Sequence, residues 1–313
     1  MLISPTPLHI PEVYLSLPVA LVCWIITALT LSVAIRRTNQ SLGERQIPLM
    51  GIMAAFIFAA QMINFPTGVG VSGHLLGGVL AAILLGPWSA MLVMTAVIAV
   101  QGLLFQDGGL TSMGANILNM GLLTAAIGYG FYRAALGRGR MTKLIFAGLA
   151  AWLSVEAGAL ATSLELWLSG SARLQVVTIA MLAVHAVIGL GEAAITVAAL
   201  GFLMRTRPDL VDESSASTQG GRGWIVAGLL VTVATLFLAP FASANPDGLE
   251  RVALDLGIVP AHPATNLPAP LANYAIPALG NTPISTVVAG AIGLVIVTIL
   301  IILAGRALRK PQS

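Results

Sequence analysis

Charged residues are scarce in this sequence. They make up 9% of its 313 residues, against roughly 25% in an average soluble domain. Hydrophobic residues account for 57%, and the mean hydropathy is +0.93. This composition excludes an ordinary soluble domain and predicts an integral membrane protein.

Cysteine is almost absent as well. Cys23 is the single cysteine and lies within an apolar stretch, which excludes both a disulfide framework and a Cys-x-x-Cys redox motif. The sequence also lacks the GxxxxGK[ST] phosphate-binding pattern, so any ATP hydrolysis must come from separate subunits, and we expect no enzyme activity in this chain.

Long apolar stretches supply the fold class. A helix needs about 20 mostly apolar residues to cross the hydrocarbon layer. One apolar stretch, His74 to Leu85, is shorter than this, and we count it as a span because the positions of the Lys and Arg residues, described below, require one more crossing. The full-length candidates are Pro18 to Ile35, Ile47 to Asn64, Trp88 to Phe105, Gly114 to Tyr132, Leu144 to Leu168, Val176 to Met204, Ile225 to Phe241 and Ser285 to Leu303.

The Lys and Arg residues orient these spans, because cytoplasmic loops carry an excess of both. With nine spans, the N-terminus outside and the C-terminus inside, every basic residue except Arg173 and Arg251 falls inside. Omitting the short third span would move the cluster at 133–143 outside. The net charge of +3 is therefore a topology signal and indicates no nucleic-acid binding.

A polar segment divides the chain into two modules. Residues 205–222 are rich in Ser and Gly, as in a flexible linker. Residues 8–204 before it hold seven spans, and residues 223–310 after it form a two-span hairpin with a long outer loop at 242–283. The predicted fold is an all-α integral membrane protein of about nine helices.

Histidines are the candidate chemical groups, because imidazole is a common ligand of late first-row divalent metals. His9 precedes the first span in Leu8-His9-Ile10-Pro11-Glu12, and His74 lies in a Gly- and Pro-rich segment, 65–78, that cannot form a regular helix. Either residue taken alone is also compatible with an ordinary loop histidine. His185 lies at membrane depth, and His262 is expected to be a solvent-exposed residue of the outer loop.

Several stretches resemble a known family. The segments 8–12, Gly68 to Gly121 and His185 to Thr196 closely resemble CbiM/NikM-type proteins. Pro246-Asp247-Gly248-Leu249-Glu250 in the second module resembles the PDGLE domain, a CbiN/NikN-like component. The resemblance implies the substrate-specific metal-binding component of an energy-coupling-factor ABC transporter, which imports Co²⁺ for cobalamin synthesis or Ni²⁺ for nickel enzymes.

The resemblance also implies partners and a site. The partners are a CbiQ/NikQ-like coupling subunit and CbiO/NikO-like ATPases in a bacterial inner (plasma) membrane, where this chain is a multi-pass protein. In the family four nitrogens hold the metal: the amine of the initiating Met, the backbone amide and imidazole of the following His, and a second His. Carried over, these fall on Leu8, His9 and His74.

This chain departs from the pattern at its start. Seven residues precede Leu8, so no free amine lies beside His9. We therefore hypothesise that translation begins at Leu8, from a leucine codon read as Met.

Ionisable groups within spans are usually functional or paired. Those of this chain are Glu156, Glu165, His185 and Glu192, and we expect either a structural network or a path for metal release. Asn64, Asn116 and Asn119 are candidates to orient the imidazoles, since metal-bound His normally has a partner on its other ring nitrogen.

Two other functions compete with metal capture for an importer. One is a stand-alone secondary transporter or channel for divalent metal, with Glu156, His185 and Glu192 relaying ions. The other is an intramembrane hydrolase that uses Ser72 with His74 or His185, which lacks a third orienting group.

Overall fold

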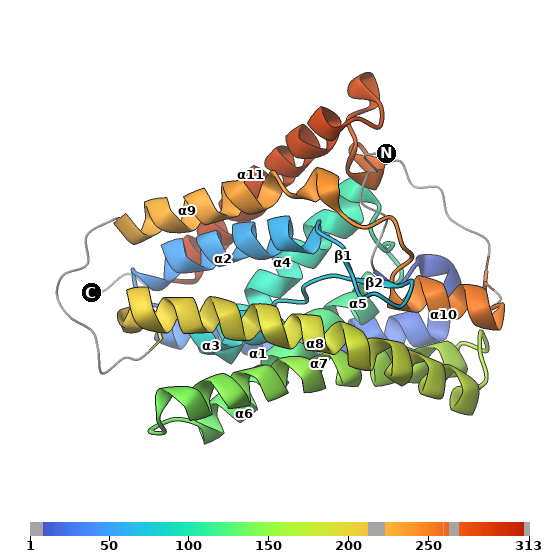
Figure 1. Ribbon diagram of the computed structural model, residues 1–313, viewed down its shortest axis with the longest axis horizontal. Helices are drawn as coiled ribbons and strands as arrows, with labels where there is room; N and C mark the ends of the chain where they lie inside the picture. Colours follow the sequence, from blue (N-terminus) through green and yellow to red (C-terminus); the bar gives the residue numbers. More distant parts are fainter. Residues whose placement is uncertain (1–8, 212–222, 259, 263–268, 310–313) are drawn as a thin grey trace.

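A computed structural model describes residues 9–211, 223–258, 260–262 and 269–309 (Figure 1). The helices of the first module are η1 (Glu12–Tyr14), α1 (Leu17–Ser41), α2 (Gln46–Gln61), α3 (Gly78–Leu85), α4 (Pro87–Phe105), α5 (Met113–Asn116), the π-helical η2 (Ile117–Leu123), α6 (Thr124–Ala134), α7 (Arg140–Leu168), α8 (Leu174–Thr206) and η3 (Pro208–Leu210). Those of the second are α9 (Gly223–Leu236), η5 (Ala239–Phe241), α10 (Gly248–Leu256), η6 (Ala272–Tyr274), η7 (Pro277–Leu279) and α11 (Pro283–Leu308). The predicted helical fold class is confirmed, and the described strands are the short pair β1 (Phe65–Pro66) and β2 (Ser72–Gly73).

Within the described part of the chain, six helices are long and apolar enough to cross a membrane. They are Leu17–Gln40, Pro87–Phe105, Arg140–Leu168, Leu174–Thr206, Gly223–Phe241 and Pro283–Leu308. Large apolar side chains point outward along them, for example Leu29 at 65% exposure and Leu190 at 63%. Such surfaces suit a lipid environment, because lipid tails are themselves apolar.

The short span expected over 74–85 needs correction. Only Gly78–Leu85 is helical there, and at 1.5 Å per residue this α3 is about 12 Å long, too short to cross a bilayer alone. Two glycines with positive φ, Gly77 at 80° and Gly86 at 76°, flank the helix. Most of α3 is buried, so it lies inside the bundle, and His74 lies in the extended segment before it.

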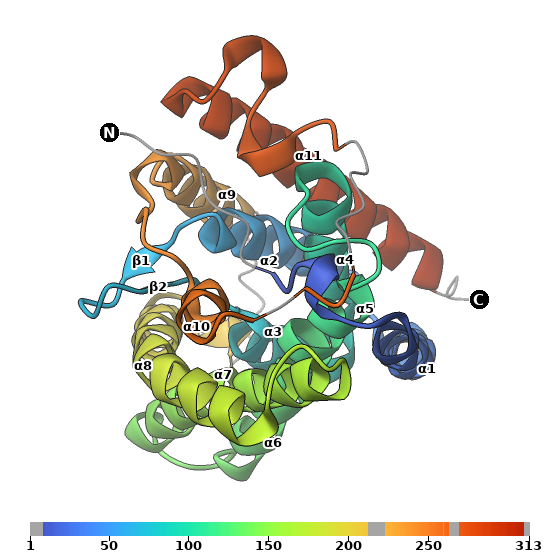
Figure 2. The same ribbon diagram turned by 90° about the vertical axis from the view of Figure 1, so that its right-hand side faces the viewer.

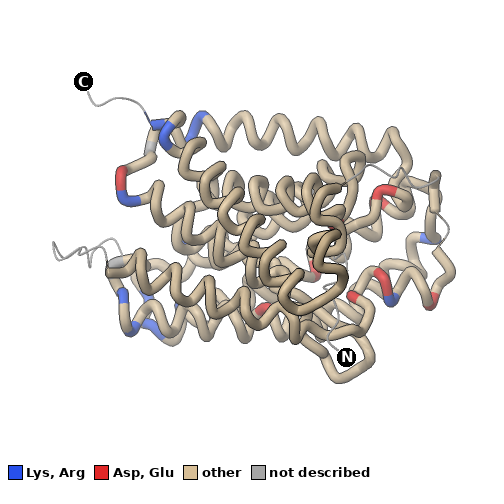
Figure 3. Tube along the Cα trace, turned by 90° about the horizontal axis from the view of Figure 1, so that it is seen from above, with Lys and Arg blue, Asp and Glu red and all other residues tan. Residues whose placement is uncertain are grey.

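The ends of the bundle differ in charge. Lys and Arg gather at one end (Figure 3), where α1, α6, α8 and α11 finish and α7 begins. The hairpin β1/β2, the start of α1 and helix α10 lie at the opposite end (Figure 1). This separation has the pattern that the positive-inside rule requires.

The second module packs on the first through helix α2. Helices α9 and α11 both contact α2, and Gly293 of α11 admits the rings of Phe58 and Phe105, which lie 2.3 and 2.7 Å from where a Cβ would stand. Phe105 in turn stacks on Tyr274, with the ring centroids 4.6 Å apart. The two modules therefore share one aromatic core.

The outer loop of the second module crosses the end of the bundle. Its helix α10 lies on α8 (Figure 2), where Leu249, Val252 and Ala253 join an apolar cluster with Val177 and Met181. This loop covers the region where the His9 and His74 segments meet.

Candidate metal centre

The segment that begins at His9 is held against the loop after α4. The backbone N–H of His9 donates to Oδ1 of Asp107 at 3.0 Å, and the His9 Nδ1 lies 2.9 Å from the same oxygen. The Ile10 N–H donates to Oδ1 of Asn116 at 2.9 Å, and the Asn116 amide donates back to the Ile10 carbonyl at 3.2 Å. The side chains of Asp107 and Asn116 therefore bond the backbone of His9 and Ile10, as the backbone of a neighbouring β-strand would.

Charge and burial act in opposite directions on His9, which is 3% exposed. Burial lowers its pKa, but the carboxylate of Asp107 and its hydrogen bonds outweigh burial, so the pKa of His9 is raised above 6.5. Its Nε2 is buried without a hydrogen-bond partner among the described residues. Buried nitrogens without a partner are rare. A metal ion can bind Nε2 only when the ring is neutral, whereas the carboxylate of Asp107 favours the protonated ring.

His74 faces His9 from the segment between β2 and α3. The two ring centroids are 6.5 Å apart and the rings are nearly perpendicular, at 72°. The Nδ1 of His74 lies 3.1 Å from the Leu75 carbonyl, which can only accept, so Nδ1 carries the proton and Nε2 keeps the lone pair. Burial and the neighbouring His9 lower the pKa of His74 to about 4, so the ring is neutral at physiological pH.

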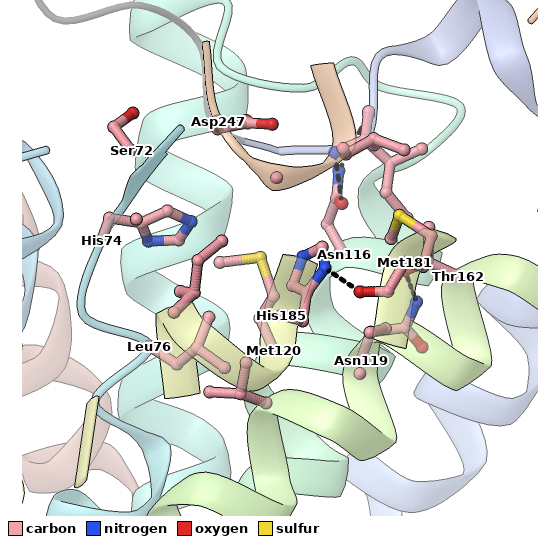
Figure 4. Close-up of a pocket in the computed structure, with 18 residues that line it drawn as sticks. Ser72, His74, Leu76, Asn116, Asn119, Met120, Thr162, Met181, His185 and Asp247 are labelled. Atoms are coloured by element: carbon pink, nitrogen blue, oxygen red, sulfur yellow. Dashed lines mark hydrogen bonds between the residues drawn. The ribbon is translucent and has the colours of Figure 1, made fainter. Parts of the chain in front are cut away.

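The rings of His74 and His185 line a cavity of about 80 Å³ (Figure 4), and His9 is not among its lining residues. Its polar lining comes from both modules, with His74, His185, Asn116 and Asn119 from the first and Asp247 from the second. Ile10, Leu76, Met120 and Met181 supply apolar and thioether surface.

His185 and Glu192 both project from α8, but they do different things. His185 lines the cavity, and its Nδ1 donates to the Met181 carbonyl at 2.7 Å. Glu192 is fully buried and accepts the N–H groups of Leu76 at 2.7 Å and Gly77 at 3.0 Å. These bonds tie α8 to the backbone that follows His74, as a structural network would.

The three candidate asparagines, Asn64, Asn116 and Asn119, make different contacts. Asn116 bonds the backbone of Ile10, and Asn119 donates to Thr162 at 3.3 Å and to Glu165 at 2.8 Å. The backbone carbonyl of Asn64 accepts the N–H of Ser243. The contacts of Asn116 position the His9 segment through its backbone, a different task from the expected orientation of imidazoles.

The remaining candidate residues lie apart from the cavity. Glu156 is half-buried on α7 and does not line it, although Val155 and Gly158 beside it do. The backbone N–H of His262 lies 3.4 Å from the Val13 carbonyl. Leu8 lies outside the described residues.

Three site residues were not predicted to act there. Asp107 bonds His9, Tyr274 donates its O–H to the other Asp107 oxygen at 2.6 Å, and Asp247 lines the cavity. Asp107 and Asp247 stand in the Gln-Asp-Gly-Gly and Pro-Asp-Gly-Leu-Glu motifs. In both motifs an aspartate directly precedes a glycine, which was an available signal.

The fold and the site define a helical membrane protein with a cavity near one end that is lined by two imidazoles, His74 and His185, and by the carboxylate of Asp247. Residues 9–210 match the model of the family described as CbiM, cobalt uptake substrate-specific transmembrane region. Residues 222–310 match the PDGLE domain. The chain therefore belongs to the CbiM family, and its second module is a PDGLE domain.

Relatives share most of this length. The NikMN protein of Archaeoglobus fulgidus is 35% identical over 94% of this chain and 96% of its own. The fused nickel transport protein NikMN of Rhodobacter capsulatus is 29% identical over 93% of this chain and 95% of its own. The cobalt transport protein CbiM of Sorangium cellulosum is 34% identical over 59% of this chain and 84% of its own.

Solved structures agree with the computed fold. One, described as a transition metal transporter, is 33% identical, covers 68% of this chain and all of its own, and has a TM-score of 0.59. A truncated transition metal transporter is 34% identical over 63% of this chain and 99% of its own, with a TM-score of 0.57.

Proposed function

We propose that this chain is the substrate-specific, metal-binding membrane component of an energy-coupling-factor ABC transporter that imports Ni²⁺ or Co²⁺. The observation that carries the proposal is the pair of facing imidazoles, His9 and His74, whose ring centroids lie 6.5 Å apart. Late divalent metals bind such nitrogens. The names of the relatives support the choice of nickel and cobalt.

The proposed ligands are the amine of residue 8 as the initiating residue, His9 and His74. The backbone nitrogen and Nδ1 of His9 can chelate one metal ion together, and capture through them requires both to leave Oδ1 of Asp107, which lies 3.0 and 2.9 Å away. Asp107 is well placed to take up the displaced proton. Translation from Leu8 remains part of this proposal, because it would supply the amine.

The chain acts with other subunits and has no catalysis of its own. A CbiQ/NikQ-like coupling subunit and CbiO/NikO-like ATPases supply the energy. Residues 8–204 form the metal-binding module, 205–222 a cytoplasmic linker and 223–310 the PDGLE module. The gathering of Lys and Arg at one end of the bundle supports the proposed topology, with the cavity outside and the C-terminus inside a bacterial inner membrane. In this topology α3, too short to cross alone, returns the chain between α2 and α4 and counts as the third of nine spans.

The outer loop of the second module closes the site. It already bonds the N-terminal segment, where the Ala261 N–H donates to the Val13 carbonyl at 2.6 Å. Tyr274 reaches Asp107 from the same loop. ATP-driven rearrangement of the partner subunits then reorients the first module and releases the cation inside.

Uptake of radioactive nickel or cobalt in cells tests this function. We expect accumulation when the chain is expressed with its coupling and ATPase subunits, and none with a hydrolysis-deficient ATPase. Deleting Asp247 to Pro277 should abolish uptake, and full uptake after this deletion would refute closure by the loop. Accumulation without the ATPases that depends on an ion gradient would instead establish a secondary transporter.

A further inference from the structure

The outer loop of the PDGLE module is fixed to the end of helix α4. The Leu271 N–H donates to the Leu104 carbonyl at 2.9 Å. The ring of Tyr274 stacks on that of Phe105, with 24° between the planes, and the Tyr274 O–H donates to Oδ2 of Asp107 at 2.6 Å. Three contacts therefore join the second module to the turn at which α4 of the first module ends.

Tyr274 adopts its position at a conformational cost. Its φ is 53° and that of Asn273 is 54°, in the left-handed region that residues other than glycine rarely adopt. Such a backbone persists only where the surrounding contacts fix it. The Tyr274 side chain is fully buried, and a buried phenol needs an acceptor for its O–H, which Asp107 supplies. The stacked ring and the bonded O–H therefore hold a loop conformation that is otherwise disfavoured.

The two oxygens of Asp107 serve different modules. Oδ1 accepts the backbone N–H of His9 and lies beside the His9 Nδ1, whereas Oδ2 accepts the O–H of Tyr274. Metal capture through the two His9 nitrogens removes both contacts of Oδ1 and need not disturb the bond to Oδ2. Asp107 is buried, and a buried carboxylate is costly without hydrogen bonds. After it has lost two donors, the carboxylate depends more strongly on each donor that stays.

We propose that Tyr274 is a positioning residue for metal capture, which holds Asp107 against the end of α4 while His9 leaves this carboxylate and turns to the metal. The inference rests on the proposed function and deepens it, because it names a residue of the PDGLE module that acts on a metal ligand without touching the metal. The ligands themselves remain nitrogens. Because the Tyr274 bond contributes more once His9 has left, its removal costs more in the metal-bound chain than in the metal-free chain. Metal binding is therefore weaker without it.

The test compares Tyr274→Phe with Tyr132→Phe in the full-length chain purified in detergent, with Ni²⁺ alone as the probe. Tyr132 is the matched control, because it is also buried and its O–H donates to the Val211 carbonyl at 3.1 Å, near the end of α6. We expect Tyr274→Phe to weaken Ni²⁺ binding about tenfold, mainly through faster release, and Tyr132→Phe to change it less than about twofold. Both variants lose a buried hydrogen bond, so a merely structural role for Tyr274 predicts equal nickel affinities.

An Asp107→Ala background tests whether Tyr274 acts through this carboxylate, because the effect of Tyr274→Phe on nickel affinity should fall below about twofold there. If Tyr274→Phe does not fold, infrared difference spectra of the wild type with and without nickel decide. A strengthened bond to Asp107 must shift the C–O band of a tyrosine, and the absence of any shift would overturn the proposal. Equal nickel affinity of the two tyrosine variants would also overturn it while leaving nickel capture intact. Absence of nickel from the wild type would instead refute the proposed function.

Discussion

Glu192 is the residue whose replacement should most clearly disturb the backbone that presents His74. Its carboxylate is fully buried, and its two oxygens accept from Leu76 N–H at 2.7 Å and Gly77 N–H at 3.0 Å. Both donors follow His74 directly and precede α3. The carboxylate therefore fixes the loop from the side opposite to the PDGLE module.

Glu192→Gln keeps the volume and changes one acceptor into a donor. The glutamine oxygen can serve one N–H, and the NH₂ group then faces the other N–H. A hydrogen bond to a charged group is worth about 1.5–3 kcal/mol, and a buried donor left unpaired costs about 1–3 kcal/mol. We expect unfolding free energy to fall by about 2–5 kcal/mol and nickel affinity to fall with it.

Unfolding of the purified chain in detergent, followed by circular dichroism, measures this change. Glu165→Gln is the matched control, because Glu165 is also buried and its bond from Asn119 at 2.8 Å survives on the amide oxygen. That variant should lose less than about 1 kcal/mol. Equal stability of the two variants would refute the assignment of Glu192 to the His74 loop.

Three further changes test the contacts around the cavity. Tyr274→Phe removes the O–H that Asp107 accepts at 2.6 Å but keeps the ring, so thermal unfolding should reveal a loss of about 1.5–3 kcal/mol. This loss should disappear in an Asp107→Ala background, which has no acceptor for the O–H. Gly248→Ala places a Cβ 2.6 Å from the His185 ring, and a loss of about 1–3 kcal/mol is expected in the same assay. Burial, then Glu250 and Asp107, raise the pKa of Asp247 from 3.8 to about 7, while the backbone N–H groups of its own helix lower it. The folded chain therefore holds a proton that the unfolded chain releases, and this stabilisation is complete below about pH 4 and lost as the pH rises through 7. Melting temperatures of the metal-free protein between pH 4 and pH 8 should show this decline in the wild type and a weaker one in Asp247→Asn.

The spans could be predicted from the sequence because a helix that faces lipid carries apolar side chains along its whole length. Each of the six helices long enough to cross a membrane overlaps a predicted stretch. The irregular segment before α3 was also predictable, since Gly68 and Gly70 adopt φ of 83° and 76°, a region that favours glycine. The short length of the stretch over 74–85 was predicted too, but the start of its helix at Gly78 rather than at His74 was not.

The histidines of the site could be predicted by motif, but their surroundings could not. Asp107 lies 98 residues from His9, and Tyr274 lies 167 residues from Asp107. Such long-range contacts depend on how the helices pack, and the hydrophobic periodicity of the sequence does not predict them. Asp247 stood in a quoted motif, yet its place in the cavity depends on α10 lying across α8.

Metal content of the purified protein tests metal capture by His9 and His74 most directly. The chain is grown with equal nickel and cobalt, purified, and measured by elemental analysis beside His74→Ala. We predict nearly one nickel or cobalt per chain in the wild type and almost none in the variant. Equal metal in both proteins would contradict capture by His74, and absence of metal from both would contradict the account as a whole.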